Sequence, residues 1–118
     1  MLTYVQYDEY QNAQPFPHIV IDNFIDTERA LEAYEKFPNS EEIPWHRFHN
    51  EREKKLAYSD VEHLPDEVFS DIIDSLETPE FCKELARIVG VEEIFPDPEY
   101  MGGGLHRIER GGHLALLS

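Results

Sequence analysis

The stretch that decides the fold spans residues 101–118 and reads MGGGLHRIERGGHLALLS. Residues 105–109 and 113–117 have the composition of two short strands, and Arg110-Gly111-Gly112 between them is typical of a turn. The pattern therefore predicts a β-hairpin. A two-stranded hairpin is only marginally stable in water, so we expect further strands beside it.

The predicted hairpin runs out in an apolar segment, residues 114–117, that carries no turn signal and no polar cap. We therefore expect an incomplete sheet with an open apolar face and exposed strand edges. The glycines at 102–104 do not predict a phosphate-binding loop, because the Lys-Ser/Thr pair and the following helix are missing. They indicate an adaptable backbone at the start of a strand.

Upstream of this stretch the sequence predicts one strand followed by three helices. Residues 16–21 contain three consecutive β-branched residues and predict a strand at a sheet edge. Asp26 is a suitable N-cap for a first helix. Pro65 opens a second helix, whose apolar residues recur at helical spacing from Val68 to Leu76.

The third helix has the clearest start and stop signals. Thr78 suits the N-cap, Pro79 suits the first helical position, and Gly90 suits the position after the last turn. Residues 41–60 favour neither a strand nor an irregular loop around Trp45 and Phe48. The chain as a whole predicts a single α+β domain over residues 1–118, with the helices first and the sheet last.

Composition excludes several classes of protein. The chain has 118 residues, of which 41% are hydrophobic and 12% aromatic, enough for a globular core. Its 25 acidic and 10 basic residues give a net charge of −15, which disfavours nucleic-acid binding. The basic cluster of Arg52, Lys54 and Lys55 is interpreted as a solvated face. No signal peptide and no membrane-spanning segment is evident, which predicts a cytoplasmic protein without a membrane partner.

Few residues stand out as chemical groups. Cys82 is the only cysteine and lies in an apolar helical pattern, so we interpret it as a packed thiol. Six histidines raise the question of a metal site, but no cysteine partner or His-Glu-x-x-His spacing accompanies them. His106 and His113 lie on opposite arms of the predicted hairpin, and its register decides whether they face one pocket. No catalytic residue and no metal ligand is predicted.

Two segments resemble the 2-oxoglutarate- and Fe(II)-dependent oxygenases of the prolyl 4-hydroxylase-like group. Residues 15–25, PFPHIVIDNFI, resemble the first strand of that group, and residues 97–108, DPEYMGGGLHRI, resemble its glycine-rich approach to the metal site. The Gly-Gly-His-Leu at residues 111–114 and the shorter segments 55–60 and 78–81 are also similar. The resemblance covers roughly residues 15–116.

The resemblance implies a double-stranded β-helix, or jelly-roll, of which this chain would hold the N-terminal helices and the first strands. It implies Fe(II) held by two histidines and a carboxylate, and 2-oxoglutarate as co-substrate. The first of these histidines would fall at Leu117, which cannot ligate, and the carboxylate would fall beyond Ser118. Ile108 and Leu114 replace residues that are often aromatic in the group. His106 is then the one polar candidate for the co-substrate cavity.

We therefore expect the N-terminal portion of such a hydroxylase, inactive by itself and without Fe(II) or 2-oxoglutarate of its own. The substrate stays open among a prolyl peptide, another protein side chain and a small molecule. The alternative is a non-catalytic binding or assembly module that buries its open sheet edge against a partner strand or a second copy. An unrelated acidic domain with a histidine-based metal site is the third hypothesis.

Overall fold

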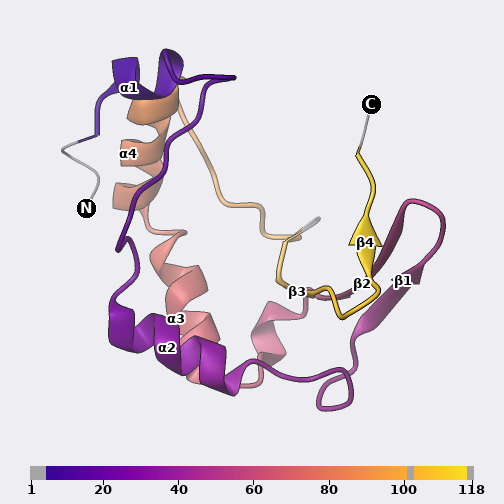
Figure 1. Cartoon of the computed structure of the whole chain (residues 1–118). Coiled ribbons are helices and arrows are strands. Elements are labelled where there is room, and N and C mark those ends of the chain that lie inside the picture. Colours follow the sequence, from indigo (N-terminus) through magenta and orange to yellow (C-terminus); the bar gives the residue numbers. More distant parts are fainter. Residues whose placement is uncertain (1–4, 101–102, 117–118) are drawn as a thin grey trace. The chain divides into compact units, whose positions relative to one another are not determined.

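The computed structural model describes residues 5–100 and 103–116 (Figure 1). The chain divides into two compact units, each made of two separate stretches. We call Met1–Glu35 with Val68–Pro96 the helical unit, and Lys36–Glu67 with Asp97–Ser118 the sheet unit. Helices and an open antiparallel sheet together confirm the α+β class.

In its described residues the helical unit contains four α-helices. They are α1 (Tyr7–Gln11), α2 (Thr27–Lys36), α3 (Glu67–Ser75) and α4 (Pro79–Val89). The last residue of α2 and the first residue of α3 belong to the sheet unit. The core of this unit forms around Val5 and Ile88, which are 2% and 1% exposed. Partly buried side chains pack against that pair; they are Tyr10, Ile19, Ile21, Phe24 and Phe81.

The ends of α4 follow the predicted signals. The Thr78 hydroxyl accepts a hydrogen bond from the Phe81 backbone N–H at 3.2 Å, and Pro79 occupies the first turn. Gly90 ends the helix in the left-handed conformation, with φ 78°, and donates to the Ala86 carbonyl. α1 lies across this C-terminal end of α4 in Figure 1, and a side chain at position 90 would collide with Tyr7.

The other two predicted helices also form, although α3 begins at Glu67 and not at Pro65. Asp26 caps α2 by accepting from the Arg29 backbone N–H at 3.3 Å, and the Arg29 guanidinium then bridges to Asp71 of α3 at 2.7 Å. The apolar stripe of α2 stays exposed, because Leu31 and Tyr34 are 53% and 79% accessible. The prediction of a helix here is confirmed. Among the described residues, none buries the Leu31 and Tyr34 side chains of this helix.

The predicted strand at residues 16–21 is wrong. This segment forms no strand pairing in the structure. Its alternating residues Ile19 and Ile21 instead pack against the Val5 and Ile88 core. The β-branched residues predicted a strand, but Ile19 and Ile21 can be buried against a helix without any partner strand.

The part of the sheet unit that the structure describes contains four strands and one short helix. They are β1 (His46–His49), β2 (Glu53–Tyr58), the 3-10 helix η1 (Val61–His63), β3 (Leu105–Arg107) and β4 (His113–Leu114). β2 is the central strand and was not predicted. It pairs antiparallel with β1 along one edge and with both β3 and β4 along the other.

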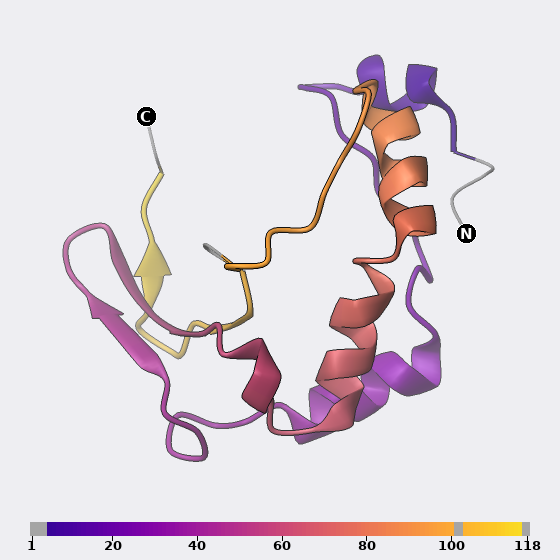
Figure 2. The same ribbon diagram turned by 180° about the vertical axis from the view of Figure 1, so that it is seen from behind.

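The predicted hairpin pairing is also wrong. β3 and β4 do not pair with each other; Leu105–Arg107 pairs with residues 56–58 of β2, and His113–Leu114 pairs with residues 53–54. Residues 108–112 leave the sheet and return through a turn closed by Gly112 N–H donating to the Glu109 carbonyl at 2.8 Å. Figures 1 and 2 both show β4 beside the β1–β2 ribbon. We call residues 108–112 the excursion loop.

One face of the sheet carries the buried core of this unit. Leu56 and Tyr58 of β2 lie opposite Arg107 and Leu105 of β3, so these four side chains share a face. The Tyr58 ring packs edge-on against Trp45 at 6.4 Å, and the Trp45 indole N–H donates to the Asn39 carbonyl at 2.7 Å.

None of the helices in residues 5–100 and 103–116 combines the length and the apolar composition that crossing a bilayer requires.

Candidate functional site

His106, the one predicted site residue, lies in the middle of β3 directly opposite Ala57. On the other side of Ala57 lies His46 of β1. Residues directly opposite in a sheet point to the same face, so His46, Ala57 and His106 form a row across three strands. Both histidines are exposed. Two strand spacings separate them, about 10 Å between Cα atoms.

His113 does not share this face. It lies opposite Lys54, three residues before Ala57 in β2. Because successive side chains of a strand alternate between faces, an odd separation places His113 and His106 on opposite sides of the sheet. The register thus answers the question that the sequence left open: these two histidines cannot face one pocket.

The neighbours of His46 form an aromatic and charged surface. Its ring meets Phe48 edge-on at 4.4 Å, and the Lys55 ammonium lies 5.4 Å from the centre of the Phe48 ring. Lys55 also pairs with Glu53 at 3.7 Å. Residues 53, 55 and 57 of β2 point to the same face of the sheet, because successive side chains alternate. Glu53 is therefore the β2 carboxylate on the face that carries His46 and His106.

These residues do not fit an Fe(II) centre of two histidines and a carboxylate. Glu53 is four residues from Ala57, roughly 13 Å along the strand, too far to join both histidines at one ion. Within the described ranges, no group of three or more metal-binding side chains comes together. We therefore derive no chemical step through iron or 2-oxoglutarate for these residues.

Two further histidines, neither of them in a strand of the sheet, make local contacts. His18 Nδ1 lies 2.8 Å from the Phe16 carbonyl, and His63 Nδ1 lies 3.0 Å from the Asp60 carboxylate. That hydrogen bond, with the charge of Asp60, raises the pKa of His63 above its usual value. Burial, and then the same carboxylate, raises the pKa of Tyr58, whose hydroxyl donates to the His63 carbonyl at 2.7 Å.

The residues that the resemblance associates with the co-substrate cavity do not converge on one cavity. Leu105 is buried at 8%, whereas Ile108 and Leu114 are 52% and 57% exposed. Leu117, at the position of the missing histidine ligand, lies outside the described residues.

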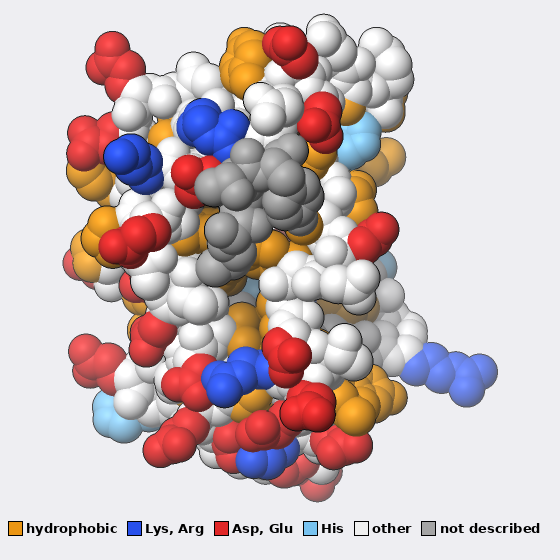
Figure 3. Space-filling model, turned by 90° about the vertical axis from the view of Figure 1, so that its left-hand side faces the viewer, with side chains coloured by type: hydrophobic (Ala, Val, Ile, Leu, Met, Phe, Trp, Pro, Cys, Tyr) orange, Lys and Arg blue, Asp and Glu red, His pale blue; other side chains and the backbone are white. Residues whose placement is uncertain are grey.

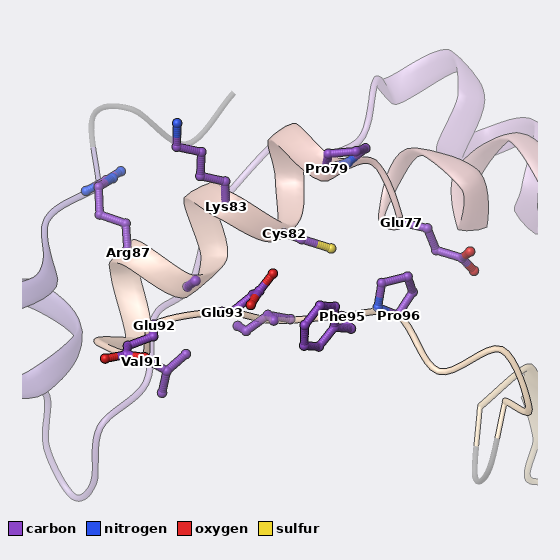
Figure 4. A pocket seen from close by; sticks show the side chains of 12 residues that line it. Glu77, Pro79, Cys82, Lys83, Arg87, Val91, Glu92, Glu93, Phe95 and Pro96 are labelled. Carbon is purple, nitrogen blue, oxygen red and sulfur yellow. The ribbon is translucent and has the colours of Figure 1, made fainter.

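A groove that the sequence did not predict runs along α4. It has a volume of about 670 Å³ and lies between α4 and the extended segment 91–96. In Figure 4 the Cys82 thiol points from the helix toward Phe95 and Pro96, while Lys83 points away from them. Cys82 is 8% exposed, which agrees with its interpretation as a packed thiol. The one sequence signal for this groove was the apolar Ile94-Phe95-Pro96 after the helix stop.

Within the sheet unit, His46 and His106 thus lie on one face of the sheet and the buried core lies on the other. No protein-family model matches the chain, and no curated protein or solved structure matches it either.

Proposed function

We propose that this chain is the N-terminal scaffold of a double-stranded β-helix domain of the 2-oxoglutarate- and Fe(II)-dependent oxygenase type. In such a domain it supplies helices and the first strands, while iron and co-substrate are held by residues elsewhere. The proposal rests on the resemblance of residues 15–25 and 97–114 to that group. The hydroxylation substrate, and a cytoplasmic location, remain predictions from the sequence.

The structural observation that supports the proposal is the open edge formed by the short strands β3 and β4. Both strands pair with β2 on their inner side, and in the described part of the chain nothing pairs with their outer side. A jelly-roll is built by adding antiparallel strands to such an edge. Gly103 and Gly104, from the segment that resembles the oxygenases, directly precede β3 on this edge.

An anaerobic titration of the chain with Fe(II) and 2-oxoglutarate tests the scaffold role. We expect no visible charge-transfer band, because the donor groups are too far apart for a triad. A saturable band would overturn the proposal. The double variant H46A/H106A would then show whether the two histidines hold the ion, with His18→Ala in the helical unit as the matched control.

A second function is favoured by the exposed apolar side chains on the same edge. Leu114 is 57% and Leu116 100% exposed, and Ala115 N–H donates to the Arg52 carbonyl, which holds this segment against the β1–β2 loop. Exposed edges with apolar side chains are templates for a partner strand. An assembly module would use this edge to bind a strand of another chain or of a second copy.

Sedimentation velocity over a hundredfold range of concentration tests the assembly function. A concentration-dependent oligomer that disappears in Leu114→Lys would support it, because a lysine on an edge strand opposes pairing. Val20→Lys replaces a side chain that is 75% exposed in the helical unit and is the matched control. A chain that stays monomeric throughout would rule out self-association.

A further inference from the structure

One face of the sheet carries the apolar side chains of Leu56 and Tyr58. Toward the start of β2, the same face carries basic side chains. His49 of β1, Lys54 of β2 and His113 of β4 lie directly opposite one another, so their side chains share this face. Arg47, two residues before His49, points to the same side. We call Arg47, His49, Lys54 and His113 the basic row.

A hollow of about 140 Å³ lies over part of the basic row. Arg47, His49 and Lys54 line it, and the excursion loop adds Arg110 and Glu109. The register places the first three side chains on one face, and the turn at residues 109–112 brings Arg110 to the same hollow. The sequence predicts that Lys54 lies on a solvated charged face. No sequence pattern links Lys54 to Arg47 or Arg110.

Most of the basic side chains at this hollow are not paired with a carboxylate, although Lys55, which also lines it, pairs with Glu53 at 3.7 Å. Among the described residues, His49, Lys54 and Arg110 form no ion pair, while Arg47 donates to the Ser40 carbonyl at 2.9 Å. Glu109 is the one carboxylate lining the hollow. Basic groups opposite each other on neighbouring strands repel when both are charged.

This concentration of positive charge contrasts with the rest of the chain. The net charge is −15, and Figure 3 shows acidic side chains spread over the visible surface with basic ones scattered among them. Elsewhere basic side chains such as Arg29 and Lys36 pair with acids, at 2.7 Å and 3.2 Å. Four of the ten lysines and arginines line this hollow: Arg47, Lys54 and Arg110, together with Lys55 from the opposite face of β2.

From these observations we propose that the hollow bounded by Arg47, His49, Lys54 and Arg110 binds the phosphate group of a small phosphate monoester. A phosphate dianion offers three strong acceptor oxygens, which suits donors converging from two strands and a loop. A carboxylate carries one charge in one plane and is satisfied by a single bidentate partner. A nucleic acid is disfavoured because the acidic surface repels a polyanion.

The site does not use the metal chemistry of the proposed oxygenase role, so either proposal can fail without the other. The phosphate proposal is tested by titrating the whole chain, at low ionic strength, with inorganic phosphate and with glycerol phosphate. Backbone amide chemical shifts in NMR spectra are the readout. Lys54→Gln and Arg110→Gln are each expected to weaken binding roughly five- to tenfold. Lys83→Gln, an equal loss of charge in the helical unit, should leave it unchanged.

Glu109→Gln supplies a prediction of opposite sign. Removing the one carboxylate of the hollow should strengthen phosphate binding a few-fold, whereas a purely structural role for the loop would not tighten it. The proposal is overturned if phosphate shifts no resonances of residues 47–56, or if Lys83→Gln weakens binding as much as Lys54→Gln. It is also overturned if acetate or a single-stranded oligonucleotide binds more tightly than the phosphates.

Discussion

Helix α4 and the β3–β4 edge differ in how far each depends on distant residues. The ends of α4 are set by Thr78, Pro79 and Gly90, all within or beside the helix itself. The β3–β4 edge owes its form to β2, which lies about fifty residues earlier in the chain. Local signals could therefore predict α4 to the residue, while the same kind of signals gave a hairpin that does not exist.

The difference teaches how to interpret a glycine pair between two apolar segments. Gly111-Gly112 does form a turn, with Gly112 N–H bonded to the Glu109 carbonyl. However, the segments on either side continue along the same partner strand and do not fold back onto each other. A turn sequence predicts a change of direction, but it does not identify the strand that receives the hydrogen bonds.

The largest expected effect concerns the core beneath α4. Ile88 is 1% exposed and packs against Val5, so Ile88→Ala leaves a cavity and should lower the free energy of unfolding by about 2 to 5 kcal/mol. Urea denaturation measures this. Val91→Ala truncates a neighbour that is 50% exposed and should cost far less. Equal effects of the two variants would mean that α4 is held mainly by its local signals.

A middle-sized effect is expected where β3 meets β2. Gly104 has φ 121°, and a side chain there would collide with the Tyr58 carbonyl, so Gly104→Ala should cost roughly 1 to 3 kcal/mol. Gly111→Ala is the matched control, because its φ is 87° but nothing lies within 4 Å of the added atom. Hydrogen exchange of the β2 and β3 amides should rise in the first variant only. Similar exchange in both would show that backbone strain, and not the β2 contact, governs this edge.

The smallest effect concerns His63, which lies on η1 after the central strand. Asp60 raises its pKa, so folding favours the protonated imidazole. This stabilisation is fully present below the unfolded pKa, about 6.5, and is lost as the pH rises through the folded pKa. Asp60→Asn should lower the His63 midpoint in an NMR titration, and Asp8→Asn in α1 should not. An unchanged His63 midpoint in Asp60→Asn would show that the Asp60 carboxylate does not raise the pKa of His63.

The sequence by itself determined the α+β class, the three main helices, the caps of α4 and the burial of Cys82. Each of these depends on residues a few positions apart, because helical periodicity and capping act within one or two turns.

Only the tertiary structure decided which residues share a face of the sheet. Pairing with β2 placed His106 on the same face as His46 and on the opposite face from His113, and it gathered Arg47, His49 and Lys54 around one hollow. A shift of the register by one residue would move every side chain of a strand to the other face of the sheet. No local pattern in Glu53–Tyr58 specifies the register. Strand pairing between distant segments is therefore what turned scattered basic residues into a candidate site.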